Sequence, residues 1–390
     1  MAKIKAHSLT GRITYSLVFQ AFSNVKRNRG AAGIDKVSIA LFEKNILDNA
    51  EALTPALKDG TFRPLPLRRV HIPKGDGKTR PLGIPAVRDR VAQEVLRQLL
   101  SPLFEQIFHD DSYGFRPARN CHQAVTRVRE LHRQGYRYVL DADIKGFFDN
   151  IPHPVIMAGV AAEVADGNIL RLVERFLKSG VMEEGGFRST PIGTPQGGVI
   201  SPLLANIALN GLDWQLHHAG FRFVRYADDF VVLCQSPTQV KEAHDLVQQH
   251  LSLIGLALNA EKTKLTRFQD GFAFLGFDIT SWSAKMRSKS VEKFKTKIRE
   301  LTPRHHNLDR NVVRKVNAVV RGTANYFATP FSSTGDLFRT LDRWIRMRIR
   351  CMKFKRKRRL DNWRLWQKHL ANMGFVFLSD ARAPPAVEPM

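Results

Sequence analysis

Cysteine is scarce in this chain of 390 residues, which contains only three, Cys121, Cys234 and Cys351. They lie far apart, so they offer neither the short spacing of a zinc site nor the even-numbered framework of a disulfide-stabilised domain. Buried thiols in a reducing cytoplasm are the simplest interpretation. Long apolar runs are also lacking: no stretch approaches the roughly 20 residues of a membrane span, and the first residues lack the apolar segment of a signal peptide. We therefore expect a cytoplasmic protein that does not enter a membrane.

Acidic residues are few relative to basic ones. The chain has 36 Asp and Glu against 61 Lys and Arg, a net charge of +25. An excess of this size predicts a polyanionic partner, most simply nucleic acid, with an anionic membrane surface as the alternative. Hydrophobic residues make up 43% of the chain, which is typical of a globular protein, and the length suggests two or three domains.

Two adjacent acids interrupt an apolar stretch in "RYADDFVVLC", residues 225–234. The flanks of Asp228 and Asp229 are rich in β-branched and aromatic residues, so they predict two strands of a hairpin with the acids at its tip. Neighbouring carboxylates repel each other, and burial would drive one of them to protonate. The pair therefore indicates either a solvated acidic turn or a site where a cation neutralises it.

A second acidic strand is predicted at 136–144, "YRYVLDADI". Asp141 and Asp143 share one face of it because strand side chains alternate. If this strand neighbours the hairpin, Asp143 joins Asp228 and Asp229 in one cluster, which is costly unless divalent cations occupy it. Magnesium suits such a site. Two Mg²⁺ ions roughly 4 Å apart, or Mn²⁺ in their place, would serve in-line phosphoryl transfer.

Helix signals include two Ser-Pro pairs. Apolar residues recur every four positions at 91–108, which predicts a helix. Ser101-Pro102 and Ser201-Pro202 both have the pattern of an N-cap followed by proline in the first helical turn, so we expect a new helix to begin at each. "KGDGK" predicts a hairpin turn. From about 288 the pattern becomes helical and strongly basic, which places a domain boundary near 285–290.

Taken together and in order, the motifs resemble those of the group II intron type of reverse transcriptase and maturase, the bacterial RNA-directed DNA polymerases. The motifs that carry the resemblance are "IPKGDGKTRPLGIPAVRDRVAQEVL", "DSYGFRP", "DADIKGFFDNIPH", "GTPQGGVISPLLANIALNGLD", "RYADDFVVL", "LNAEKTKL" and "FAFLGFDI". They cover roughly residues 20–285. "VNAVVRGTANYF" and "LDRWIRMRIR" extend the resemblance into the thumb, or maturase, region.

The resemblance implies an α+β fold: a right-hand polymerase with an antiparallel palm sheet and fingers, followed by an α-helical thumb/maturase domain. The expected divisions are an N-terminal extension and the start of the fingers (1–60), fingers (61–135), palm (136–287, with a fingers insertion near 155–190) and thumb (288–390). No Cys/His endonuclease set follows the thumb, so no endonuclease domain is expected.

Residue roles follow from the resemblance position by position. Asp143, Asp228 and Asp229 match the catalytic acids that bind the metal ions. Phe148 matches the aromatic residue that excludes a ribose 2′-hydroxyl. The alternative is that Phe148 belongs to the core; if Phe148 instead contacts the sugar, Phe147 beside it is the core residue. Lys262 is a weaker candidate for substrate binding.

Other matches concern the nucleotide and the primer. Lys74 and Arg80 match fingers residues that hold the incoming triphosphate, and Arg suits bidentate phosphate contacts. Gln196 and Gly197 of "TPQGG" match the loop beside the nucleotide. The remaining assignments are Leu275 and Gly276 as the primer grip, Lys78 as either a phosphate contact or a solvated charge, and Asp141 and Asp149 as structural residues.

The segment 343–359, "RWIRMRIRCMKFKRKRR", has ten Lys or Arg and no acid. Like charges at this density repel on a solvated helix, so a surface that follows nucleic-acid phosphates is favoured. The predicted contacts are Arg343, Arg346, Arg350, Lys353, Lys355, Arg356, Lys357, Arg358 and Arg359. Trp363 and Trp366 either stack on bases or fill the core, and we favour the core.

The function implied is an RNA-directed DNA polymerase encoded by an intron, which binds group II intron RNA, aids splicing and copies the RNA during retrohoming. Its partners would be that RNA or another structured RNA as template, a DNA primer or target, and dNTPs, in a nucleoid-associated or ribonucleoprotein particle of the bacterial cytoplasm. The alternatives are a domesticated enzyme of the same chemistry in antiphage defence or DNA repair, and a splicing factor that binds RNA without catalysis.

Overall fold

The structure is a computed structural model, and it describes residues 5–75, 78–183, 186–194 and 197–380. The chain divides into two compact units, one formed by 1–131 and 138–265 and the other by 132–137 and 266–390. Within the described ranges, no helix has both the length and the apolar character needed to cross a membrane.

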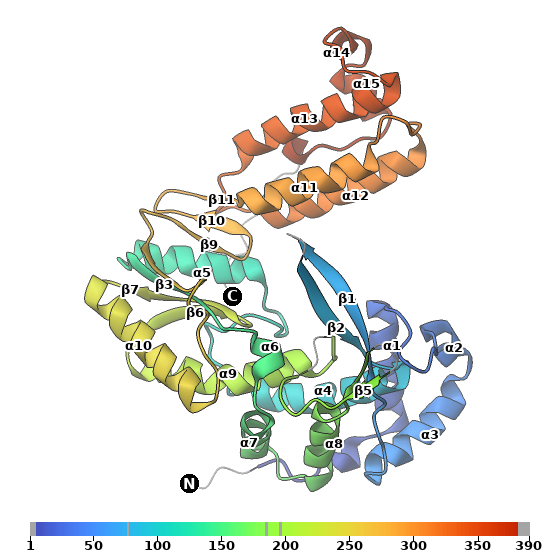
Figure 1. The fold of residues 1–390 in the computed structure, drawn as a ribbon, viewed down its shortest axis with the longest axis vertical. Coiled ribbons are helices and arrows are strands. Elements are labelled where there is room, and N and C mark those ends of the chain that lie inside the picture. The colour runs from blue at the N-terminus through green and yellow to red at the C-terminus, as the bar shows by residue number, and fades with distance from the viewer. Residues whose placement is uncertain (1–4, 76–77, 184–185, 195–196, 381–390) are drawn as a thin grey trace. The chain divides into compact units, whose positions relative to one another are not determined.

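The first unit is a mixture of helices and short sheets (Figure 1). Its helices are η1 (Thr10–Arg12), α1 (Tyr15–Asn28), α2 (Ile39–Lys44), α3 (Ile46–Lys58), α4 (Val87–Glu105), α5 (Cys121–Arg133), α6 (Phe147–Asn150), α7 (His153–Glu163), α8 (Gly167–Leu177), α9 (Ser201–His218) and α10 (Pro237–Leu253). Its strands are β1 (Leu67–Gly75), β2 (Lys78–Ile84), β3 (Tyr138–Asp143), β4 (Val181–Glu183), β5 (Gly186–Arg188), β6 (Arg222–Tyr226) and β7 (Asp229–Cys234), and β8 (Lys264–Arg267) lies where the chain passes into the second unit.

The central sheet of the first unit has the strand order β6-β7-β3-β8. β7 pairs antiparallel with both β6 and β3. Val139, Leu140, Val231 and Val232 are fully buried, as expected for β-branched and aliphatic residues in central strands. Helices α9 and α10 pack against this sheet (Figure 1). The strand predicted at 136–144 is present as β3, and the hairpin predicted around Asp228 and Asp229 is present as β6 and β7.

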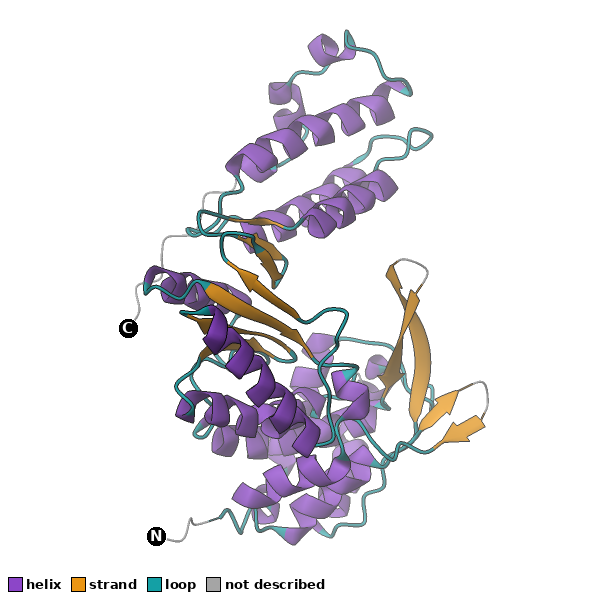
Figure 2. Cartoon of the chain, turned by 60° about the vertical axis from the view of Figure 1, so that its left-hand side comes forward, coloured by secondary structure: helices purple, strands orange, loops and turns teal. Residues whose placement is uncertain are grey.

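A second sheet has the order β2-β1-β4-β5. β1 and β2 form the long antiparallel hairpin predicted around "KGDGK" (Figure 2), and β1 runs parallel to β4. Residues 76 and 77, between β1 and β2 in the sequence, lie outside the described residues.

The two Ser-Pro pairs have different outcomes. Ser201 and Pro202 begin α9, as predicted. The expected helix start at Ser101 is wrong, because α4 continues through Pro102 as one helix. Proline in a helix interior costs a hydrogen bond. Here burial outweighs that cost: α4 buries apolar residues on both sides of Pro102, and a break would expose them to water.

The second unit begins with a three-stranded antiparallel sheet of order β11-β10-β9 and continues with helices (Figure 2). Its elements are β9 (Phe272–Phe274), β10 (Phe277–Ile279), β11 (Ala284–Met286), α11 (Ser288–Leu301), α12 (Arg310–Phe327), α13 (Gly335–Phe354), α14 (Asp361–Arg364), α15 (Gln367–Asn372) and η2 (Leu378–Asp380). Asp342 of α13 is buried and accepts hydrogen bonds from the backbone N–H groups of Leu378 and Ser379, at 2.8 and 2.9 Å, which fixes the C-terminal segment on the helices.

This architecture confirms the predicted α+β class, with an antiparallel sheet among helices and a mainly helical C-terminal part. The proposed limits of fingers, palm and thumb stay predictions. The chain passes from one compact unit to the other after residues 131, 137 and 265.

Candidate active site

The pairing of β3 with β7 brings the predicted acids together. Asp143, the last residue of β3, lies opposite Asp229, the first residue of β7. Cα atoms of directly paired residues are about 5 Å apart, and consecutive Cα atoms about 3.8 Å, so the Cα atoms of Asp143 and Asp228 lie within about 9 Å. Paired residues also direct their side chains to the same face of a sheet. Two acidic segments distant in sequence thus meet at one end of the sheet.

The turn that carries Asp228 has an unusual backbone. Tyr226 pairs with Asp229, which leaves Ala227 and Asp228 as a two-residue loop. Ala227 has φ +60°, a left-handed conformation that costs an L-residue about 1–2 kcal/mol. A positive φ at the first loop position matches the twist of a tight hairpin. The strain is local and adjoins the acid, as is common at functional sites.

Asp228 lies in an environment that opposes its negative charge. Burial raises its pKa, and the negative charge of Asp143 raises it further; a hydrogen bond from its own backbone N–H and the positive charges of Arg80 and Lys262 act in the opposite direction. Lys262 contacts Asp143 directly, with Nζ 3.0 Å from Oδ2. The site therefore joins two carboxylates that repel each other with two cations that moderate the repulsion.

The donor chemistry suits a divalent cation. Carboxylate oxygens are the ligands that Mg²⁺ prefers, and a cation would stabilise the ionised form of half-buried Asp228. Among the residues that the structure describes, no three His, Cys, Asp or Glu side chains are gathered closely enough to hold an ion. The nearest partner of the Asp143 carboxylate is the Lys262 ammonium. A cation bound by Asp143 would thus compete with Lys262.

Phe147 and Phe148 differ in burial. Phe147, which is 2% exposed, fills the core. Phe148 is half-buried and lines a cleft of about 400 Å³ together with Arg69, His71 and Pro81 of the β1–β2 hairpin. The Phe148 side chain is therefore placed to meet a molecule in that cleft.

The loop that precedes α9 packs on the backbone of α6. The N–H of Thr194 donates to the carbonyl of Phe148 at 2.7 Å. Gly197 has φ +112°, and a Cβ there would lie 2.4 Å from the carbonyl oxygen of Gly83 in β2, so only glycine fits this approach. Gln196 lies outside the described residues. Thr194 thus lies against α6 and Gly197 against β2.

The two predicted triphosphate contacts belong to the β1–β2 hairpin. Lys74 is in β1, and Arg80 in β2 is exposed and pairs with Ile72. The positive charge of Arg80 lowers the pKa of Asp228, so Arg80 acts electrostatically on the acidic site. The structure thereby associates one of these two basic residues with the acids.

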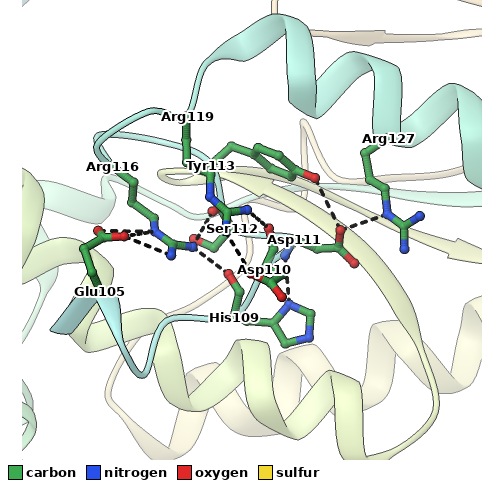
Figure 3. Close-up of polar contacts among 9 residues, drawn as sticks. All are labelled: Glu105, His109, Asp110, Asp111, Ser112, Tyr113, Arg116, Arg119 and Arg127. Carbon is green, nitrogen blue, oxygen red and sulfur yellow. Dashed lines mark hydrogen bonds and ion pairs between the residues drawn. The ribbon is translucent and has the colours of Figure 1, made fainter. Parts of the chain in front are cut away.

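Arginine side chains stabilise residues 109–119, a segment beside the β6–β7 hairpin (Figure 3). The Arg116 guanidinium donates to two backbone carbonyls of the same segment, at 2.7 Å each, and pairs with Glu105 of α4 at 3.0 Å. Arg127 of α5 pairs with Asp111 at 2.9 Å (Figure 3). These charge-assisted bonds make the segment a fixed support.

The same segment is bonded to β6 and packs against the turn. Tyr113 N–H donates to the carbonyl of Arg225 at 2.8 Å, and Arg225 N–H donates to the carbonyl of Asp111 at 2.9 Å. A Cβ on Gly114 would lie 2.4 Å from the backbone nitrogen of Ala227. Glycine is therefore required at 114 for this close contact with the turn.

Sequence reasoning missed a buried polar group beneath the turn. Arg225 is 0% exposed and pairs with Asp213 of α9, which is equally buried; its Nε donates to Asp213 Oδ1 at 2.7 Å. A signal was present, because Arg225 interrupts an otherwise apolar part of the strand "RFVRY" just before the acids. Charged residues are almost never fully buried unless they are paired.

The predicted primer-grip residues form a second tight turn, in the C-terminal unit. Leu275 and Gly276 connect β9 to β10, with φ +48° and +81°. Positive φ at both loop residues is the sign pattern of a type I′ turn. The Tyr326 hydroxyl donates to the Leu275 carbonyl at 2.9 Å, which ties this turn to α12.

The predicted RNA-binding arginines and lysines differ in their surroundings. Arg350 donates from Nε to the Leu365 carbonyl at 2.8 Å and from Nη1 to Asn362 at 2.7 Å, so it supports the chain after α13. Arg356 pairs with Asp361 at 3.1 Å. Exposed positions are Arg343, Lys353, Lys355, Lys357, Arg358 and Arg359, and Arg346 is half-buried.

Two tryptophans correct a prediction. Trp363 and Trp366 were expected in the core, but they are 69% and 47% exposed. They follow the basic segment and contact each other, with ring centroids 5.4 Å apart. The expectation failed because Trp363 in the short α14 and Trp366 just before α15 both lie at the surface.

Two family models match the chain. Residues 72–279 match the model of the reverse transcriptase (RNA-dependent DNA polymerase) family, and residues 291–370 match the group II intron maturase-specific domain. The chain therefore belongs to the reverse transcriptase family. Its domain content, a polymerase domain followed by a maturase-specific domain, confirms the predicted class of RNA-directed DNA polymerase with a maturase region.

Two curated proteins and one solved structure are similar to this chain. The chain is 34% identical over 283 residues to protein YkfC of Escherichia coli (strain K12), covering 63% of this chain and 74% of that protein. It is 30% identical over 335 residues to the group II intron-encoded protein LtrA of Lactococcus lactis subsp. cremoris, covering 67% of this chain and 55% of LtrA. The chain thus spans about half the length of LtrA. A solved structure of telomerase from Candida albicans matches with 15% identity and a TM-score of 0.44, over 81% of this chain and 63% of that chain.

Proposed function

We propose that this protein is a group II intron-encoded reverse transcriptase that binds intron RNA, aids its splicing and copies it into DNA. The observation that carries the proposal is the meeting of Asp143 and the Asp228–Asp229 turn at one sheet end, with Arg80 and Lys262 acting on the same carboxylates. The maturase-specific domain that follows the polymerase domain supports the intron RNA as partner.

In this proposal Asp143, Asp228 and Asp229 would hold two Mg²⁺ ions, with Mn²⁺ as a substitute. Bound metal supplies activation of the primer 3′-hydroxyl and charge neutralisation at the leaving pyrophosphate. Arg80 binds the phosphates of the incoming dNTP, since a guanidinium forms bidentate contacts with phosphate. Lys262 exchanges its contact with Asp143 for a contact with the substrate. Phe148 closes the sugar side of the nucleotide site.

Primer extension tests the polymerase part. The full chain is incubated with an RNA template, a DNA primer, dNTPs and Mg²⁺. We expect extension by the parent protein and its loss in Asp228→Asn, which keeps the size of the side chain but removes the charge. Asp245→Asn is the matched control, because Asp245 is an acid on α10 with a side chain 82% exposed. Absence of extension by the parent protein would contradict the polymerase proposal and favour a splicing factor that only binds RNA.

RNA sequencing tests the intron part. RNA that copurifies with the protein is sequenced and compared with the DNA flanking the gene. Recovery of a group II intron RNA, and faster splicing of that RNA when the protein is added, are the expected results. An active polymerase that recovers no such RNA, with no intron domains beside its gene, would contradict the maturase role and favour a domesticated enzyme.

A further inference from the structure

The buried side chain of Arg225 has partners on two elements of the first unit. Four of its five N–H donors are used. Nε and Nη2 bond the two carboxylate oxygens of Asp213, and Nη1 bonds Asn206 Oδ1 at 2.9 Å and the carbonyl of Ala227 at 3.0 Å. Asn206 and Asp213 lie seven residues apart on α9, two helical turns, and so on the same face.

The bond to Ala227 distinguishes this ion pair from one that only joins a helix to a strand. Ala227 is the left-handed residue of the turn, and its carbonyl belongs to the peptide group shared with Asp228. The direction of that carbonyl sets the direction in which the next residue leaves the turn. A guanidinium presents its donors in a rigid plane. Because Asp213 and Asn206 of α9 hold this plane, they also fix the direction of its bond to the Ala227 carbonyl.

Asn206 extends the connection to the opposite side of the turn. Its Nδ2 donates to the carbonyl of Gly114 at 2.8 Å, and Gly114 is the residue that packs against the Ala227 nitrogen. One amide on α9 therefore holds both the guanidinium and the supporting segment. Asn206 is 1% exposed, so water does not compete for these bonds.

We propose that Arg225, held by Asp213 and Asn206, is a positioning residue that fixes the Ala227 peptide and thereby the location of the Asp228 carboxylate. The expected effect on kcat rests on the proposed polymerase function, whereas the expected effect on the structure of the turn does not. Arg225 itself touches no substrate: it acts through the turn.

An apolar replacement separates positioning from stability. Buried ion pairs can often be replaced by apolar residues without loss of stability, so the test variant is Arg225→Met combined with Asp213→Leu. The control is Arg97→Met combined with Glu94→Leu, a less buried ion pair of α4 in the same unit with N···O 2.6 Å. Asn206→Ala, which leaves the Arg225–Asp213 pair in place, is the second test variant if the double variant does not fold.

The first measurement is hydrogen exchange on the metal-free full chain, which needs no enzymatic activity. We expect amides of the peptide covering 222–234 to exchange at least about 10-fold faster in the test variants than in the parent, with no such change in the control. Unchanged exchange in this peptide would overturn the proposal whether or not the protein is a polymerase.

The second measurement is steady-state primer extension with dNTP varied. Misplacement of a catalytic group by about 1 Å can lower a rate about 100-fold. We expect kcat of the test variants to fall about 10- to 100-fold, with KM for dNTP within about twofold of the parent, and the control to retain the parental kcat. A folded test variant with parental kcat would overturn the proposal, whereas inactivity of the parent and of all variants would count against the polymerase function alone.

Discussion

Replacing Gly114 by alanine should displace the turn that carries Asp228. The added Cβ would lie 2.4 Å from the nitrogen of Ala227 and 2.9 Å from the carbonyl carbon of Tyr226. Both are backbone atoms, which cannot rotate away as a flexible side chain would. Real Cβ contacts essentially never fall below 3.0 Å, so the turn or the segment must move by the difference, at least about 0.6 Å.

Neither side can move freely. Gly114 is held through its carbonyl by Asn206, and the preceding residue, Tyr113, is bonded to Arg225 in the strand itself. A displacement of about 1 Å costs about 100-fold in rate, so a displacement of about 0.6 Å should lower kcat on the order of 10-fold. Overpacking should also reduce the free energy of unfolding by about 1–3 kcal/mol.

The assay is single-turnover primer extension at saturating dNTP, with chemical denaturation in the same buffer. Gly11→Ala is the control, because nothing lies within 4 Å of a Cβ at that position. It should match the parent in both measurements. A folded Gly114→Ala protein that extends primers at the parental rate would refute the reasoning, since the turn would then tolerate the displacement without loss of function.

Three further predictions concern stability, nucleotide choice and RNA binding. Burial raises the pKa of Asp89 to about 6, so the folded state binds this proton more tightly than the unfolded state, and the free energy of unfolding falls as pH rises from 4 to 7. Asp89→Asn removes this dependence, so its free energy of unfolding should rise relative to that of the parent by about 3 kcal/mol between pH 4 and 7. Urea denaturation at each pH measures the difference, and a difference that does not change with pH would contradict the prediction. Phe148→Ala should raise incorporation of ribonucleotides relative to dNTPs, measured by competition, and unchanged discrimination would remove Phe148 from the sugar site. RNA affinity should fall steeply with salt, and Lys357→Met should reduce the slope of log K against log salt by about one; a flat affinity would argue against the basic segment as the RNA surface.

The sequence predicted the strands that carry the acids well because the information for them is local. The alternation in "YVLDAD" and the apolar flanks of Asp228 determine strands, and the family motifs imply that these strands are neighbours. Prediction was weaker where tertiary packing decides. Identical Ser-Pro pairs gave a helix start at Ser201 and a helix interior at Ser101, because buried residues on both sides of Pro102 favour continuity.

The buried support of the turn was missed for a related reason. No local pattern announces that Arg225 will meet Asp213 and Asn206, because their contacts depend on how α9 packs against β6. Trp363 shows the converse error: a large aromatic residue predicts burial only when the element that carries it has a face to bury. Residue type predicts a preference for the interior, but the packing of the helices and strands determines which positions are buried.

The pairing of β3 with β7 has a consequence for how the chain is made. Asp143 ends β3, and all of α6 to α9 must be synthesised before β7 leaves the ribosome. Non-local strand pairings are slow to form, and until then β3 exposes Val139 and Leu140, which are fully buried in the native protein. Unpaired apolar strands associate readily with other chains, so nascent chains halted before β7 should depend on chaperones to stay soluble.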